Sequence, residues 1–145
     1  MSILYRMINP PVRWLLRSPI HGLMSKNTLL LEFQGRKSGR ALSTPISYYE
    51  AGGVMRGFTD RRFGWWRNLE QGRVHATVRG RRYEVRAEVE LAEPEVRKGL
   101  RSFLRAVPRD ASHAGVALAV DGTPSEEDIA RVAGNMVHLI FHPQR

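Results

Sequence analysis

The segment VHATVRGRRYEVRAEVEL, residues 74–91, decides the fold class. Apolar residues alternate with polar or charged ones on both sides of Gly80, which is the pattern of two strands with one buried and one solvated face. A glycine between two such runs permits the tight turn of an antiparallel hairpin. We therefore expect a long hairpin that turns at Gly80. Its arginines and glutamates are expected to pair across the strands rather than to form a catalytic carboxylate site.

Four other runs have the composition and period of strands. They are TLLLEF, STPISYYE, VMRGFT and MVHLIFH, which begin at residues 28, 43, 54 and 136. Gly52 and Gly53 supply a tight reversal between the second and third of these runs. At least five strands, joined mostly as hairpins, predict a sheet that closes into a small antiparallel barrel.

Helical periodicity follows the long hairpin. From Pro94 onward apolar residues recur at helical spacing until Pro108 stops the helix. A second helix is expected to begin with Thr123 as its N-cap, inside a capping box, and to end at Gly134. The predicted fold is therefore α+β and mainly β, a single domain over residues 1–145 with helices packed outside the barrel.

The N-terminal segment, residues 1–24, is expected to be helical and amphipathic, with Asn9 and the two prolines after it starting a helix. Packing on the domain's own core is favoured over peripheral contact with a membrane, but both alternatives stay open. The segment has no apolar run long enough for a signal core or a spanning helix, which argues against export. Together with the absence of cysteine, this predicts a cytoplasmic protein, membrane-associated if the helix binds lipid.

The chain carries a formal charge of +9, and almost all of its 23 basic residues are arginines. The guanidinium group binds phosphate and carboxylate through two parallel hydrogen bonds, so this bias indicates an anionic partner. Candidate partners are nucleic acid, anionic lipid and a phosphorylated cofactor. Coding bias is an equally weighted alternative, because alanine, glycine and valine are also plentiful.

The turn QGRKSGR, residues 34–40, is a candidate anion site. Its glycines permit positive φ and leave backbone N–H groups open, while Arg36, Lys37 and Arg40 add charge and Ser38 adds a hydroxyl. The spacing differs from a P-loop, which has four residues between its glycines and a lysine after the second. The alternative is an ordinary basic hairpin turn.

The segment TDRRFGWWRNL, residues 59–69, is the second candidate site. Its aromatic rings and arginines can stack on a flat heterocycle and hold its phosphate. The alternative is that Trp65 and Trp66 anchor a short helix, and at least one of them is expected to be in the core because neighbours on a helix point about 100° apart.

Other reaction classes find no support in the sequence. It contains neither a G-x-S-x-G elbow nor an H-E-x-x-H motif. His138 and His142 lie in a predicted strand, where four residues span about 13 Å, too far for both to bind one metal. We therefore predict no metal site.

The order of these motifs, from the apolar strand and GRKSGR through WWRNL to GRVHATVRGRRY, resembles the deazaflavin-dependent nitroreductase family. The resemblance runs from about residue 28 to residue 91. It implies an antiparallel split β-barrel of the flavin-reductase or FMN-binding type that holds coenzyme F420 or, alternatively, FMN or FAD. The cofactor-binding residues that it implies are Arg36, Lys37, Ser38, Gly39, Arg40, Ser43, Thr44, Pro45, Trp65, Trp66 and Asn68.

The same resemblance implies an oxidoreductase in which the cofactor carries out hydride transfer to a quinone, an enone or a nitro compound. Tyr48, Tyr49 or a residue near the N-terminal helix is a candidate proton donor, no protein nucleophile is expected, and a homodimer is slightly favoured. The chain departs from the family in its shorter TDRRFG loop and in Leu42, where members have arginine. Two rival functions stay open, a nucleic-acid-binding small barrel and a relative that binds a flavin without turnover.

Overall fold

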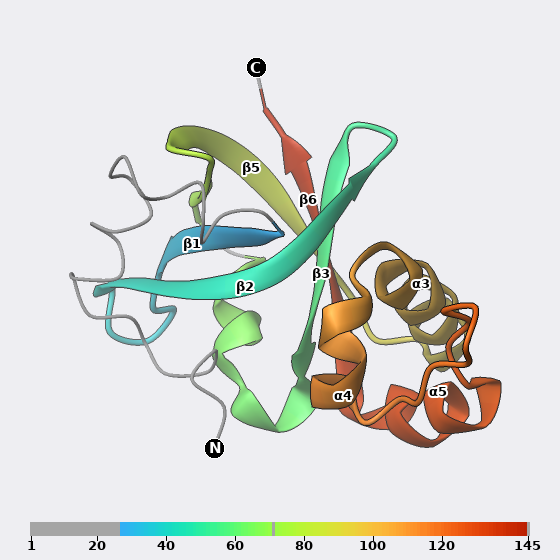
Figure 1. Cartoon of the computed structure of the whole chain (residues 1–145). Coiled ribbons are helices and arrows are strands. Elements are labelled where there is room, and N and C mark those ends of the chain that lie inside the picture. The colour runs from blue at the N-terminus through green and yellow to red at the C-terminus, as the bar shows by residue number, and fades with distance from the viewer. Residues whose placement is uncertain (1–26, 71, 145) are drawn as a thin grey trace.

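The protein forms a closed antiparallel barrel with helices on one side (Figure 1). The computed structural model describes residues 27–70 and 72–144, so the amphipathic segment predicted for residues 1–24 lies outside the described residues. The strands follow the order β1-β2-β3-β6-β5-β4 around the barrel. They are β1 (Thr28–Gln34), β2 (Ala41–Ala51), β3 (Val54–Asp60), β4 (Val74–Val78), β5 (Arg81–Glu90) and β6 (Met136–Pro143). The predicted antiparallel β-barrel and the mainly β, α+β class are confirmed.

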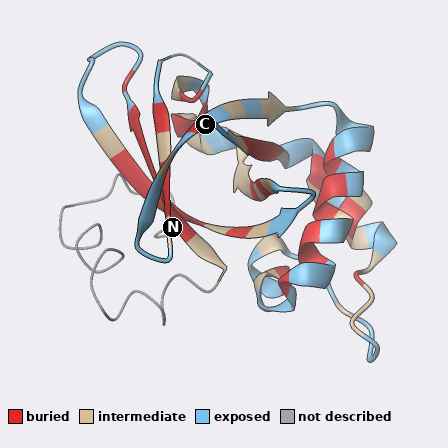
Figure 2. Ribbon diagram, turned by 90° about the horizontal axis from the view of Figure 1, so that it is seen from above, coloured by how far each residue is buried: buried red, intermediate tan, exposed pale blue. Residues whose placement is uncertain are grey.

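Alternating residues of the strands fill the barrel. Leu29, Leu31 and Phe33 of β1 point inward and pack against Phe141 of β6, and all four side chains are buried. The band of buried residues along the strands continues into the helices (Figure 2). There α3 (Glu93–Ala106) covers the outer face of the sheet, with α4 (Ala111–Ala114) and α5 (Glu126–Val132) beside it.

The hairpin β4–β5 turns at Arg79 and Gly80, as predicted. Both residues have positive φ, 51° and 81°, which is the conformation of a type I′ turn. A left-handed backbone costs a residue with a side chain about 1 kcal/mol. The charged residues of β5 do form pairs, but with other strands of the barrel rather than across the hairpin as predicted: Arg82 Nε lies 3.0 Å from Glu32 Oε1 of β1, and His142 Nε2 of β6 lies 2.9 Å from Glu88 Oε1.

Strands β2 and β3 pair along only part of their length. Residues Tyr48 to Ala51 pair with Gly57 to Val54, and beyond these β2 continues along β1 while β3 continues along β6. Because Tyr48 N donates to Asn27 O on the β1 side, the backbone N of Pro45 points toward β3. Proline has no N–H for a ladder, so it fits a strand edge that has no partner there. The barrel is therefore split beside Pro45.

The barrel closes between β1 and β4. This ladder comprises three residue pairs, Leu30–Glu32 with His75–Thr77, whereas β1 pairs with β2 over seven.

Helix α3 forms where the apolar period predicts it, and it buries Val96, Leu100, Phe103 and Leu104. The predicted cap of the next helix is wrong by two residues. Ser125 is the N-cap of α5 and accepts a hydrogen bond of 3.1 Å from Asp128 N, whereas the backbone N of Thr123 donates to Asp121 Oδ1. The capping box of the observed helix therefore runs from Ser125 to Asp128, two residues after the predicted one. None of the helices in the described part of the chain is long and apolar enough to span a membrane.

His138 is buried between the barrel and α3. Its ring stacks on Phe58 with centroids 4.6 Å apart, and a Cβ added to Gly99 of α3 would meet the ring at 2.5 Å. Nε2 has no hydrogen-bond partner. Burial, and secondarily the charge of Arg56, lowers the pKa of His138 to about 4, so the ring is neutral at neutral pH.

This burial predicts a pH-dependent stability. Unfolding returns His138 to an ordinary pKa, so the unfolded chain binds its proton more tightly than the folded chain does. The stabilising effect is fully present above pH 6.5 and is lost toward the folded pKa of about 4. The free energy of unfolding is expected to fall by about 2 kcal/mol between pH 7 and pH 5 in urea titrations. His138→Leu should remove that fall, whereas the exposed control His113→Gln should keep it. An equal slope in His138→Leu would contradict this account.

Candidate functional site

The turn between β1 and β2 holds itself together through its own backbone. Gly35 N donates to Arg40 O (2.9 Å), Gly39 N to Gly35 O (2.8 Å) and Arg40 N to Ser38 Oγ (3.2 Å). Gly39 has a φ of 71°, which explains the glycine at that place. Most N–H groups of the turn are therefore already bonded. The predicted backbone cradle is thus largely occupied by internal hydrogen bonds, whereas the side chains of Arg36, Lys37 and Arg40 are exposed.

The structure brings the two candidate motifs together. Arg36 N donates to Asn68 Oδ1 over 2.8 Å, and Asn68 Nδ2 donates to Trp65 O over 2.8 Å. The Trp65 ring also stacks on Phe33 of β1, with centroids 5.9 Å apart. Asn68 thus joins the basic turn to the tryptophan segment, although the two lie far apart in the sequence.

Both tryptophans are core residues. Trp65 and Trp66 are 4% and 6% exposed, and Trp66 Nε1 donates to Arg61 O over 3.1 Å. The segment forms two short 3-10 turns, Arg61–Phe63 and Trp65–Asn68, rather than one helix. Arg67 lies over the Trp66 ring at 4.5 Å. The interpretation of these residues as core anchors is therefore confirmed for both, and their large faces pack on protein.

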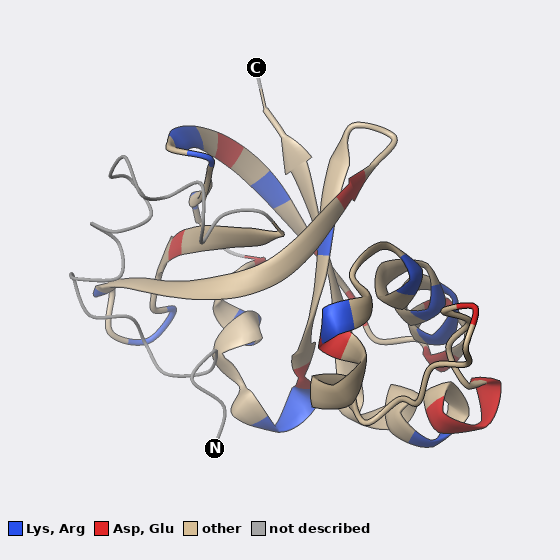
Figure 3. Ribbon diagram, viewed as in Figure 1, with Lys and Arg blue, Asp and Glu red and all other residues tan. Residues whose placement is uncertain are grey.

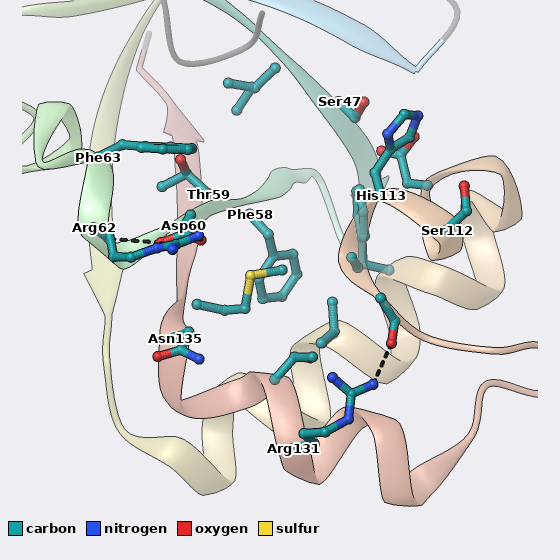
Figure 4. Close-up of a pocket in the computed structure, with 18 residues that line it drawn as sticks. Ser47, Phe58, Thr59, Asp60, Arg62, Phe63, Ser112, His113, Arg131 and Asn135 are labelled. Carbon is teal, nitrogen blue, oxygen red and sulfur yellow. Dashed lines mark hydrogen bonds and ion pairs between the residues drawn. The ribbon is translucent and has the colours of Figure 1, made fainter. Parts of the chain in front are cut away.

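A cavity of about 830 Å³ opens where β2 and β3 part (Figure 4). Its strand wall consists of Ile46 and Ser47 of β2 and residues 58–60 of β3, and the chain continues along it through Arg62 and Phe63. Residues of α3, α4 and α5 form the opposite wall. The polar residues that line it are Ser47, Thr59, Asp60, Arg62, Asp110, Ser112, His113, Arg131 and Asn135.

Charged groups at the cavity are held in place by defined contacts. Asp60 caps the following 3-10 turn by accepting from Arg62 N (2.8 Å), and it pairs with the Arg62 guanidinium (2.7 Å). The hydrogen bond from that side chain lowers the pKa of Asp60, so it stays ionised. On the opposite wall Arg131 donates to Gly115 O over 2.7 Å. The cavity thus combines apolar walls with fixed polar groups, as small-molecule sites do.

None of the individually predicted cofactor-binding residues lines this cavity, although Thr59, Asp60, Arg62 and Phe63 of the second candidate segment do. Ser43, Thr44 and Pro45 are buried on β2, directly before Ile46. Tyr48 and Tyr49, the suggested proton donors, line a different hollow. The lining residues come mainly from strands β2 and β3 and from helices α3, α4 and α5, which are distant in sequence, and they share no single local motif. Two sequence signals point toward the cavity: the segment after β3, and Pro45, which marks an unpaired strand edge.

No protein-family model and no curated protein matches the chain. Solved structures do match. A pyridoxamine 5′-phosphate oxidase-related, FMN-binding protein from Nostoc punctiforme superposes with a TM-score of 0.55 at 14% identity, over 94% of this chain and 81% of that one. A FAD-binding protein from Mesorhizobium loti has a TM-score of 0.52 at 10% identity, over 97% and 93%. A domain-swapped dimer has a TM-score of 0.53 at 14% identity, over 91% and 99%. At these identities the likeness establishes the fold, and the predicted split barrel of the FMN-binding type is confirmed.

Asn68 is expected to stabilise the basic turn. In Asn68→Ala both hydrogen bonds are lost, and we expect the free energy of unfolding to fall by about 1 to 2 kcal/mol. Hydrogen exchange at the Arg36 amide, measured by NMR, should accelerate because its acceptor is gone. The exposed asparagine Asn135, changed to alanine, serves as a control and should alter neither quantity. Unchanged protection of the Arg36 amide in Asn68→Ala would show that this contact does not hold the turn.

Proposed function

We propose that the chain is an oxidoreductase that binds a deazaflavin such as coenzyme F420, or a related flavin (FMN or FAD), in the cavity between β2 and β3. The cavity where these strands part is the observation that carries the proposal. Its volume of about 830 Å³ falls within the range of cofactor pockets. Two of the solved structures with this fold are described as FMN-binding and FAD-binding.

The described residues fit such a cofactor. Residues 59–68 run without a break from the cavity to the basic turn, because Thr59 lines the cavity and Asn68 bonds to the turn. Along this segment Arg61 Nε and Trp65 Nε1 are buried donors without a hydrogen-bond partner. Oxygen atoms of a ligand tail would provide acceptors after a small shift of these side chains. We place the ring in the cavity and the anionic tail along this segment.

In this arrangement the basic turn holds the negative end of the cofactor. Arg36, Lys37, Ser38, Gly39 and Arg40 form the exposed bend that receives it. Ser43, Thr44 and Pro45 shape the strand edge beside the cavity, and Trp65, Trp66 and Asn68 support the wall from behind. Trp65 and Trp66 would act through packing, since both are buried.

The bound cofactor would supply hydride transfer to a small electrophilic acceptor such as a quinone, an enone or a nitro compound. The chain's own residues would orient the acceptor and exclude water. Ser47 of β2 and Ser112 and His113 near α4 line the cavity and carry exchangeable protons. They replace Tyr48 and Tyr49 as candidates for giving a proton to the reduced acceptor.

A nucleic-acid-binding function is not favoured. Such binding needs a continuous basic track, whereas basic and acidic segments are intermixed on the described surface (Figure 3). Many arginines are already paired with carboxylates, as in the Arg101–Glu126 pair at 2.6 Å and the Arg97–Glu93 pair at 3.0 Å. A homodimer and a cytoplasmic location stay predictions. One solved structure of this fold is a domain-swapped dimer, which supports the first.

Cofactor binding can be tested by fluorescence titration with coenzyme F420, FMN and FAD. Arg36→Ala/Lys37→Ala removes two charge-assisted contacts and should weaken binding of the preferred cofactor by about tenfold or more. The control Arg97→Ala/Lys98→Ala also removes one arginine and one lysine, here from the exposed face of α3, and should leave the affinity unchanged. Ser47→Trp fills the cavity and should abolish binding, with circular dichroism confirming that the fold is retained.

Failure of all three compounds to bind the wild type would refute the proposal, as would full affinity in a folded Ser47→Trp variant. Equal affinity in the wild type and in Arg36→Ala/Lys37→Ala would show that the anionic tail of the cofactor does not bind at the turn. Binding without oxidation of the reduced cofactor by any acceptor would identify a protein that binds without turnover.

A further inference from the structure

A second hollow of about 700 Å³ lies at the other end of the barrel. It is bordered by Asn27, which precedes β1, and by the turn between β4 and β5, whereas the basic turn follows the far end of β1. We call it the mouth cavity. None of its lining residues lines the cavity between β2 and β3, so the two are separate. The mouths of small barrels are frequent ligand sites.

Two arginines face the mouth cavity. Arg81 pairs with Val78 in the β4–β5 ladder and stands two residues before Tyr83, so it continues the inward-facing register of the strand. Arg79 and Arg81 are exposed, and neither forms an ion pair with another residue of the described chain. Glu50 also borders the hollow, which leaves an excess of one positive charge.

The backbone at this rim is held in an uncommon conformation. Asn27 and Arg79, with φ of 83° and 51°, are the non-glycine residues of positive φ in the described ranges, and both line the mouth cavity. Asparagine tolerates this conformation, but arginine does not favour it, and the first place of a type I′ turn normally takes asparagine, aspartate or glycine. Residues held in such conformations cluster at functional sites.

Tyrosines form the remaining wall of the mouth cavity. Tyr48, Tyr49 and Tyr83 line it, and Tyr48 is 6% exposed. Burial raises the pKa of Tyr48, and the nearby Arg79 charge only partly opposes this, so the phenol stays protonated and can donate a hydrogen bond. Phenol rings provide flat apolar surface, and their hydroxyl groups provide donors.

We infer that the mouth cavity binds a small aromatic compound that carries an oxyanion, either a phosphate or a carboxylate. Arg79 and Arg81 bind the oxyanion, because a guanidinium fork matches the geometry of both groups. The tyrosines pack against the ring. This site goes beyond the proposed cofactor site and does not depend on it.

Isothermal titration calorimetry at low salt can test the site with three coumarin probes. They are 4-methylumbelliferyl phosphate, coumarin-3-carboxylate and uncharged coumarin. We expect one or both charged probes to bind the wild type, and coumarin to bind at least about tenfold more weakly. Whichever of the two charged probes binds more tightly shows whether the site prefers a phosphate or a carboxylate.

Arg79→Asn is the sharpest variant, because asparagine suits the turn and only the guanidinium is lost. Its melting temperature should equal or exceed that of the wild type, while its affinity for the charged probe should fall by about tenfold. Arg81→Gln should show a similar loss. Arg86→Gln changes an exposed arginine of the same strand that does not line the mouth cavity, and it should bind as the wild type does.

The inference is overturned if neither charged probe binds, if coumarin binds equally well, or if both Arg79→Asn and Arg81→Gln keep full affinity. Arg36→Ala/Lys37→Ala should leave probe binding intact. Loss of binding in that variant would place the probe at the basic turn instead. Failure of the mouth cavity is thus distinguishable from failure of the cofactor proposal, which rests on the turn and on Ser47.

Discussion

The parting of β2 and β3 is the constraint on which the arrangement of the site depends. Pro45 has no N–H to offer toward β3, and from Ser47 back to Ala41 strand β2 pairs with β1 while β3 continues along β6. Helices α3, α4 and α5 cover this gap and leave a hollow between themselves and the strands. After β3 the chain continues through residues 59–68 from the hollow to the basic turn. There Asn68 Oδ1 accepts a hydrogen bond from Arg36 N of the turn.

The strand pattern predicted most of the fold but little of the site. Alternation around Gly80 identified the β4–β5 hairpin, and helical spacing identified α3, because each signal is local. The N-cap of α5 was misplaced since Thr123 and Ser125 are both good capping residues, and only the contact to Asp128 N decides between them. The hollow beside Ser47 joins residues from distant elements, which no local pattern encodes. The contact of Arg36 with Asn68 likewise follows from tertiary structure alone.

The arginine excess has two different uses on the described surface. Arg62, Arg82, Arg97, Arg101 and Arg131 are paired with carboxylates, and exposed pairs of this kind contribute little to stability. Among the arginines with no such pair in the described residues, Arg36 and Arg40 lie at the β1–β2 turn and Arg79 and Arg81 at the β4–β5 turn, while others, such as Arg56 and Arg86, are spread along the strands. Net charge alone predicts an anionic partner. The unpaired arginines at the two turns form two small basic groups and do not make one continuous basic face.

The short ladder between β1 and β4 has a consequence for motion. Three residue pairs close the barrel there, against seven between β1 and β2, so thermal fluctuations should break this seam before the neighbouring one. Such an opening leaves the β1–β2 hairpin intact and lets it swing as a unit, uncovering Leu31 and Phe33. The barrel is therefore expected to open along the β1–β4 ladder, and the β1–β2 hairpin, which carries the basic turn, is the part that moves.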